Sequence, residues 1–221
     1  MKAFNGSEEL KKTFVNRMHE HVKLDNLIQG ETWANGKGCF IGCSFESYNH
    51  KNFEKIGLPI WLARLADKIF EGLSKNDAQI FARDFYSKIN VGADLDKIKI
   101  PFLIYVCESV LEYVQGGQFK KQKYAIENIV FELKKEVIDY NSLREARNAA
   151  ADAAAYAAAA YAAAYAAAYA AYAADAYAAA TAYAYTAAAA YAANAADDDA
   201  AKKRKYKLFA DKLFELMEKE K

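Results

Sequence analysis

Cysteine is scarce in this chain, and so is proline. The 221 residues include three cysteines, Cys39, Cys43 and Cys107, and two prolines. A small and odd number of cysteines argues against a disulfide framework and favours a reducing compartment. The first residues also lack the uninterrupted apolar run of a signal peptide, because charged residues recur every few positions. We therefore expect a cytoplasmic protein.

The chain also lacks an excess of charge of either sign. Its 30 Lys and Arg residues are balanced by 29 Asp and Glu residues. This balance produces no long-range field that attracts nucleic acid, so nucleic acid is not an expected partner. A membrane is not expected either. The longest stretch without basic residues, residues 149–196, is mainly Ala, which is nearly neutral toward insertion, and Tyr, which prefers the interface.

Sequence signatures of several enzyme classes are missing. The chain has no phosphate-binding loop, no dinucleotide fingerprint, no Ser/His/Asp signature and no metalloprotease motif. Catalysis is therefore unsupported by a motif, although it is not excluded. No cofactor is expected.

Glycine and proline are absent after Gly117, and Lys, Arg and Glu are absent from residues 149–196. Because Ala is the best helix former, this Ala/Tyr tract is predicted to be helical. Several of its tyrosines, Tyr165 and Tyr169 among them, fall on one helix face. That face either packs inside a bundle of closely approaching helices or presents these tyrosines to a ligand or partner. A homo-oligomer that uses the same face is a further alternative.

The spacing of apolar residues elsewhere predicts an all-α fold. Ser7 is expected to cap the first helix, and Asn76 or Asp77 the third. The apolar run at 100–114 is expected to be a buried helix, and the helix at 120–150 leads into the Ala/Tyr tract without a breaker. The predicted helices cover residues 8–28, 59–71, 76–89, 100–114 and 120–150.

An amphipathic helix is predicted to end the chain and to close the core. The acidic run before it and the basic run at 202–205 are expected to pair four residues apart on a solvated face. The predicted organisation is a helical globular part (1–148), the tract packed back as a bundle (149–196) and the C-terminal segment (197–221), together one cooperative unit. The apolar stripe of the last helix comprises Tyr206, Leu208, Phe209, Leu213, Leu216 and Met217.

Candidate chemistry concentrates in the glycine-rich segment Gly30–Pro59. Cys39 and Cys43 are four residues apart, and His50 follows them. They are interpreted as small packing residues, because free cysteines are among the most buried residue types. Two alternatives stay open: a thiol nucleophile paired with His50, and a zinc site formed by Cys39, Cys43, His50 and His21 or His19.

Ligand binding by the same segment would use an aromatic side chain, a tight turn and a nearby cation. Trp33, Asn35, Gly38, Gly42 and Arg64 are the candidate ligand-binding residues. Trp33 is either a hydrophobic plug or a stacking wall. Arg64 either pairs with Asp67 three residues on or completes an anion site with backbone amides of the Gly38–Gly42 turn.

Three segments carry a resemblance to known proteins. They are "WANGKGCFIGC", "YNHKNFEKIGLPIWLARLADKIFEGL" and, close to the end, "ADKLFELME". With the Ala/Tyr-rich stretch, they resemble a family of uncharacterised bacterial and bacteriophage proteins. The resemblance implies a microbial or phage context and no particular activity.

These observations favour a non-enzymatic binding protein that engages or sequesters a protein or small ligand. A cysteine-dependent hydrolase or transferase is the first alternative, and a structural or oligomer-forming helical protein is the second.

Overall fold

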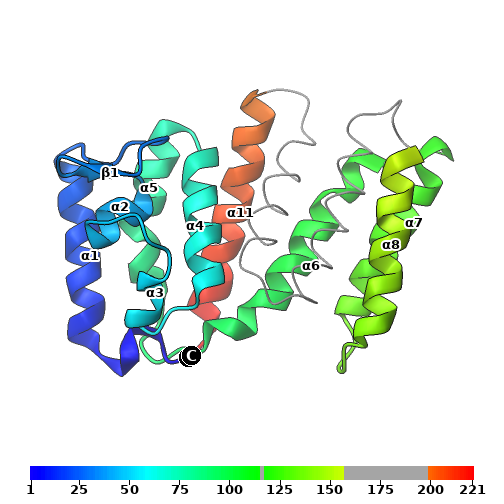
Figure 1. The fold of residues 1–221 in the computed structure, drawn as a ribbon, viewed down its shortest axis with the longest axis horizontal. Coiled ribbons are helices and arrows are strands. Elements are labelled where there is room, and N and C mark those ends of the chain that lie inside the picture. Colours follow the sequence, from blue (N-terminus) through cyan, green and yellow to red (C-terminus); the bar gives the residue numbers. More distant parts are fainter. Residues whose placement is uncertain (115–116, 157–198) are drawn as a thin grey trace. The chain divides into compact units, whose positions relative to one another are not determined.

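The chain folds mostly as α-helices, as the sequence predicts (Figure 1). The computed structural model describes residues 1–114, 117–156 and 199–221. Their α-helices are α1 (Glu8–Lys23), α2 (Phe40–Phe45), α3 (Asn52–Lys55), α4 (Ile60–Gly72), α5 (Lys75–Phe85), α6 (Lys99–Ser109), α7 (Lys120–Leu133), α8 (Tyr140–Tyr156) and α11 (Asp199–Lys219). The short elements are 3-10 helices η1 (Ala3–Gly6), η2 (Tyr86–Lys88), η3 (Leu95–Ile98), η4 (Leu111–Val114) and η5 (Gly117–Phe119), and strands β1 (Trp33–Ala34) and β2 (Lys37–Gly38).

Two compact units make up the chain. Unit 1 comprises Met1–Lys99 and Tyr206–Lys221, and unit 2 comprises Ile100–Lys205. The limits of these units do not coincide with residues 148 and 196, where the composition changes. Most of the C-terminal helix therefore belongs to the same unit as the N-terminal part of the chain.

Helix α1 begins as predicted and ends earlier than predicted. The Ser7 hydroxyl accepts a hydrogen bond from Leu10 N–H at 3.2 Å, which satisfies an N-terminal amide. The helix ends at Lys23 instead of residue 28, because Asp25 adopts a positive φ of 51° and turns the chain away. Leu27 then forms a parallel β-bridge with Gly38 of β2.

The cap of α5 differs from the prediction. Ser74 caps this helix, with its hydroxyl accepting from Asp77 N–H at 3.1 Å and donating to the Asp77 carboxylate at 2.6 Å. Of the two caps that the sequence suggested, Asn76 and Asp77, the second is instead the partner of the Ser74 cap, three positions later.

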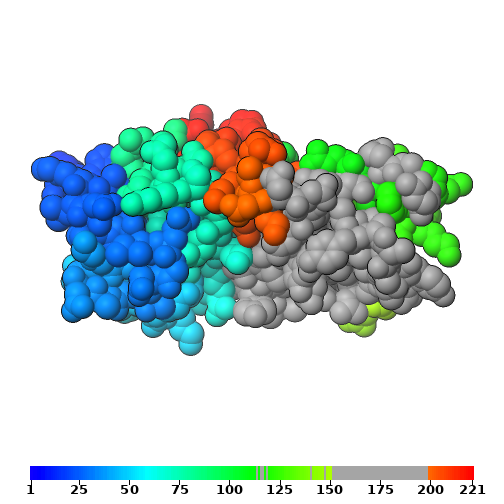
Figure 2. All heavy atoms as spheres, turned by 90° about the horizontal axis from the view of Figure 1, so that it is seen from above, coloured from blue at the N-terminus to red at the C-terminus, as the bar shows by residue number. Residues whose placement is uncertain are grey.

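Aromatic side chains form the core of unit 1. Phe40, on α2, lies within 4.9 to 6.5 Å of five other rings, measured between centroids. Phe40 itself is fully buried. Such rings bury large apolar areas, so this cluster holds α2 between α4 and α5. Helix α1 contacts α5, and in the space-filling view the N-terminal segments (blue) lie beside the segments coloured teal (Figure 2). The five neighbouring rings are Phe53, Phe70, Phe81, Phe85 and Tyr86.

The C-terminal helix packs against earlier helices, as expected. Leu213 and Met217 are fully buried, and the Phe214 ring stacks on Phe81 with centroids 5.2 Å apart and planes 4° apart. Tyr206 covers Gly72, where a Cβ would overlap the tyrosine ring. The predicted apolar stripe is wrong at Leu208, which is 48 % exposed.

Unit 2 contains a helical hairpin that the sequence did not predict. The continuous helix expected over 120–150 breaks between α7 and α8 without glycine or proline. Asp139 provides the break, since its carboxylate accepts from Asn141 N–H at 3.0 Å and from the Ser142 hydroxyl at 2.7 Å, and so starts a new helix. Leu133 of α7 and Leu143 of α8 are buried.

The basic run at 202–205 is only partly a solvated face. Lys203 pairs with Asp199 at 2.6 Å, four residues earlier, as predicted. Lys205 is instead buried, and its ammonium donates to the Ser109 carbonyl at 3.0 Å and to Glu112. Burial of a lysine requires such a set of acceptors.

Candidate functional site

A two-residue turn fixes the chain directly before Cys39. Strands β1 and β2 pair antiparallel, with Trp33 opposite Gly38. Asn35 and Gly36 connect them with φ values of 52° and 80°, the left-handed conformations that a type I′ turn requires. Asn35 is therefore explained by the turn, and Cys39 follows at the end of the hairpin.

Close packing explains the two glycines that flank Cys39. A Cβ on Gly38 or Gly42 would overlap the carbonyl oxygen of Thr32, and on Gly42 it would also lie 3.2 Å from the carbonyl carbon. The same carbonyl accepts a hydrogen bond from Cys39 N–H at 3.2 Å. These contacts account for both glycines without the anion site considered for them and Arg64.

The two cysteines of the segment have different surroundings. Cys39 caps α2, with its sulfur accepting from Gly42 N–H at 3.5 Å. Burial and the neighbouring Asp67 carboxylate raise the pKa of the Cys39 thiol well above its usual range. Cys43 donates to the Gly38 carbonyl at 3.4 Å, and burial raises its pKa to about 12. Both thiols are therefore protonated near neutral pH.

Five side chains converge near the start of α2, and we call them the Cys39 cluster. Cys39, Asp67 and Glu71 offer a sulfur and two carboxylate oxygens that all lie within 4.8 Å of one another. Tyr48 O–H donates to Asp67 Oδ2 at 3.1 Å, and His50 Nε2 lies 3.0 Å from the same oxygen. Asp67 is thus the centre of the cluster. Helix α4 carries both carboxylates of the cluster, those of Asp67 and Glu71.

Asp67 is buried, yet only one of its oxygens is paired. The residue is 7 % exposed, and Oδ2 has the two partners named above. Within the described part of the chain, Oδ1 has no partner at hydrogen-bond distance and angle, and the nearby Cys39 thiol is a weak donor to this carboxylate. The basic side chain that contacts Asp67 is His50 and not the expected Arg64. Arg64 Nε, on the same helix, also lacks a hydrogen-bond partner among the described residues. A buried carboxylate oxygen without a well-formed hydrogen bond is costly, so this position is a candidate binding point.

Glu71 is held by the loop that precedes the hairpin. Gly30 N–H donates to Glu71 Oε2 at 2.7 Å. The Gln29 side-chain amide donates to the carbonyls of Phe70 and Leu73, at 2.7 and 3.0 Å, and thereby ties the loop to the end of α4. Burial raises the pKa of Glu71 above its usual value, and the Gly30 amide opposes this shift.

His21 and Trp33 contact each other and are not members of the cluster. Their rings meet edge to face at 5.9 Å, and His21 Nδ1 lies 3.4 Å from the Asn26 side-chain amide. Burial lowers the pKa of His21. The zinc set considered from the sequence, Cys39 and Cys43 with His50 and His21, is not brought together. Over residues 1–114, 117–156 and 199–221, the one compact group of three or more potential metal ligands is Cys39, Asp67 and Glu71.

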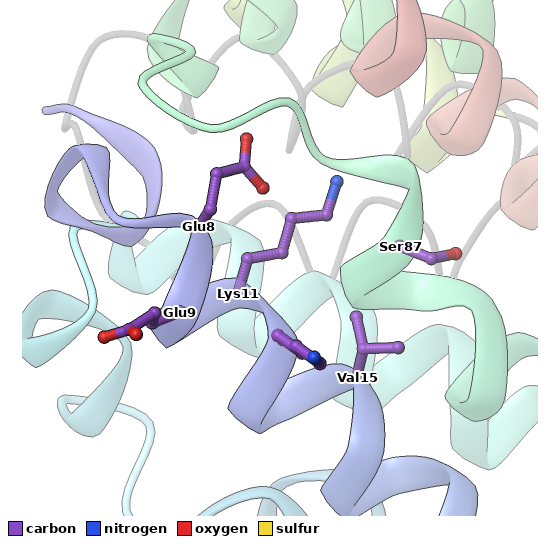
Figure 3. Close-up of a pocket in the computed structure, with 6 residues that line it drawn as sticks. Glu8, Glu9, Lys11, Val15 and Ser87 are labelled. Atoms are coloured by element: carbon purple, nitrogen blue, oxygen red, sulfur yellow. The ribbon is translucent and has the colours of Figure 1, made fainter.

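A surface groove of about 450 Å³ lies along one flank of α1. Figure 3 shows Glu8, Glu9, Lys11 and Val15 on this helix, with Ser87 on the neighbouring segment. Acidic and basic side chains together on one face are typical of a solvated helix. We assign no function to this groove.

Two of the sequence-predicted ligand-binding residues, Tyr165 and Tyr169, lie outside the described residues, as does most of the Ala/Tyr tract. Within the described residues, no helix has the length and apolar character needed to cross a membrane.

Sequence reasoning missed three members of the cluster. The sequence indicates Asp67 only as a partner of Arg64, and it singles out neither Glu71 nor Tyr48. Asp67 and Glu71 stand four residues apart on a predicted helix, so they share one face. That spacing was a usable signal. The fold alone brings this face to Cys39.

Comparison with models of protein families, with curated proteins and with solved structures finds no match to this chain. The assignment of a function therefore depends on the cluster itself.

Proposed function

We propose that the protein is a non-enzymatic binding protein, that the Cys39 cluster is its binding site, and that its ligand is a cation. The observation that carries this proposal is the buried Asp67 carboxylate, whose Oδ1 has no well-formed hydrogen bond and which lies beside a thiol and a second carboxylate. A cation beside Oδ1 supplies the interaction that burial otherwise denies this oxygen. Glu71 and Cys39 add a second carboxylate and a sulfur at the same point.

The environment of the thiols supports a binding role over a cysteine-dependent hydrolase or transferase. A nucleophilic cysteine requires a lowered pKa and a base directed at its sulfur. The pKa of Cys39 is raised, and His50 directs Nε2 at Asp67. The carboxylate that neighbours Cys39 disfavours the thiolate, which is the opposite of activation.

The remaining parts of the proposal rest on the sequence. A reducing cytoplasm agrees with three free, buried cysteines. The phage or bacterial context and the engagement of a protein through Tyr165 and Tyr169 stay predictions, and so does a structural or oligomer-forming role. Analytical sedimentation tests the oligomer-forming role, because a protein that sediments as a monomer at micromolar concentration contradicts it.

Thermal unfolding with added cations tests the proposal. Zinc, magnesium and methylammonium chlorides serve as probes, under reducing conditions. A ligand at one hundred times its Kd stabilises the folded state by about 2.7 kcal/mol, which raises the Tm by about 5 to 10 °C for a chain of this size. We expect at least one probe to do so, and Asp67→Asn to abolish the shift.

Asp211→Asn is the matched control, because it also converts an acid to an amide but lies on the surface of α11. This variant should retain the shift. If none of the probes stabilises the wild type more than Asp67→Asn, the proposed function is wrong.

A further inference from the structure

We infer that the Cys39 cluster binds a divalent transition-metal ion of the zinc type, with Cys39 Sγ and one oxygen each of Asp67 and Glu71 as ligands. This inference rests on the proposed function and names its ligand. The three candidate ligand atoms lie within 4.8 Å of one another, and two elements, the start of α2 and one face of α4, supply them.

The spacing of these atoms is close to that of a bound site. Zinc–sulfur bonds of about 2.3 Å and zinc–oxygen bonds of about 2.0 Å place tetrahedral ligands about 3.5 Å apart. The separations in the cluster therefore need to shorten by about 1.3 Å at most. Side-chain rotations of the three ligands are of the size that such a change requires.

The donor set selects the kind of metal. Magnesium and calcium prefer sites made only of oxygen ligands. Sulfur with carboxylate oxygen and imidazole nearby suits a borderline ion such as Zn²⁺ or Co²⁺. An organic ammonium ion gains little from a sulfur acceptor, because sulfur accepts hydrogen bonds weakly. The presence of Cys39 beside the two carboxylates thus favours a transition metal over the other cations.

The hydrogen bonds around the cluster orient these ligands. Tyr48 and His50 both bond to Oδ2 of Asp67, which leaves Oδ1 for the metal. Gly30 N–H holds the Glu71 carboxylate, and Gly42 N–H points at the Cys39 sulfur. Hydrogen bonds that orient the metal-ligating side chains in this way are a general feature of protein metal sites.

Coordination also defines what happens to the protons. Cys39 binds as a thiolate, so its proton passes to solvent when the metal–sulfur bond forms. Any proton on Glu71 is released in the same way. Three protein ligands leave a fourth tetrahedral position for water or for an added ligand.

Titration with Co²⁺ tests the inference directly. The full chain is reduced, freed of reductant and titrated with Co²⁺, while absorption is followed in the near ultraviolet and the visible. We expect one equivalent to produce a thiolate-to-cobalt charge-transfer band and visible bands of tetrahedral intensity, both removed by Zn²⁺. Cys39→Ser should abolish the charge-transfer band, and Cys43→Ser, the matched control with its sulfur on the Gly38 carbonyl, should keep it.

Glu71→Gln provides a second variant in case Cys39→Ser does not fold. It keeps an acceptor for Gly30 N–H and removes a carboxylate ligand, so Co²⁺ affinity should fall at least tenfold. Glu54→Gln, on the surface of α3, should leave the affinity unchanged. A charge-transfer band that survives in folded Cys39→Ser, or wild-type affinity in Glu71→Gln, overturns the inference.

The result also separates this inference from the proposed function. If Co²⁺ and Zn²⁺ do not bind at the cluster, but methylammonium stabilises the wild type and not Asp67→Asn, the metal assignment is wrong and the binding role stands. If no cation acts through Asp67, both are wrong.

Discussion

The substitution Gly42→Ala tests whether packing against Thr32 positions Cys39. Two effects compete. Ala is favoured over Gly inside a helix by about 1 kcal/mol, and α2 would gain that amount. The added methyl would overlap the Thr32 carbonyl oxygen and would lie 3.2 Å from Trp33 Cβ.

The overlap should outweigh the helix preference. Overpacking of a buried position costs about 1 to 3 kcal/mol. Displacement of Thr32 also weakens its hydrogen bond from Cys39 N–H, but this N–H keeps its shorter bond to the Glu31 carbonyl at 2.9 Å, so the added loss is below the usual value of about 1 kcal/mol. The net expected destabilisation is about 1 to 3 kcal/mol, or a decrease in Tm of about 2 to 12 °C.

Thermal unfolding followed by circular dichroism measures this change. Gly117→Ala is the control, because a Cβ there meets nothing within 4 Å among the described residues. Its Tm should stay unchanged or rise slightly, since Ala restricts the unfolded chain. A Tm for Gly42→Ala equal to or above that of the wild type would refute the packing explanation.

Three other predictions concern the core and the thiols. Leu213→Ala should lower the free energy of unfolding, measured by chemical denaturation, by about 2 to 5 kcal/mol, because Leu213 is fully buried. Leu208→Ala, on the exposed side of α11, should change it by less than about 0.5 kcal/mol. Equal effects would contradict the docking of this helix. Trp61→Phe should lower the free energy of unfolding by about 1 to 3 kcal/mol, because it removes the hydrogen bond that Nε1–H donates to Asp96 at 2.8 Å. Asp96→Asn retains an acceptor, so its effect should be smaller. A larger effect of Asp96→Asn than of Trp61→Phe would argue against this bond. The native thiols should react slowly with iodoacetamide at pH 8, because all three cysteines are buried. A pKa of about 12 for Cys43 and Cys107 leaves about one of these thiols in ten thousand as thiolate at that pH. Fast labelling of native Cys39 would instead support the hydrolase or transferase alternative.

Much of the helical architecture could be predicted because local signals and tertiary packing agree. Ser7 caps α1 where the sequence suggested, and the apolar spacing of the last helix identified Leu213 as buried. The sequence-based prediction of secondary structure is wrong where a short-range turn signal also defines a pair of strands. Asn35-Gly36 is a strong hairpin signal, but it was interpreted only as a tight turn within an all-helical chain.

The break between α7 and α8 shows a different limit. Asp139 and Ser142 cap the new helix with side-chain hydrogen bonds, and a search for glycine and proline does not detect such a break. Packing of α7 on α8 then stabilises the hairpin over a single long helix, which local propensity alone would favour.

The candidate site was predicted in part. The sequence singles out the glycine-rich segment, whose role as a binding site stays a prediction, and its Cys39 and His50 both lie near the Asp67 carboxylate. Their common partner, Asp67, comes from a helix whose orientation depends on the aromatic core. No spacing rule connects residues 39, 50 and 67, so only the fold reveals the cluster.

The central claim is that the Cys39 cluster binds a transition metal, and anomalous X-ray diffraction tests it most directly. Crystals of the reduced protein grown with Zn²⁺ are measured on both sides of the zinc absorption edge. We expect one strong anomalous peak about 2.3 Å from Cys39 Sγ and about 2.0 Å from oxygens of Asp67 and Glu71. Zinc bound only elsewhere on the protein, with no peak at the cluster, would contradict the claim.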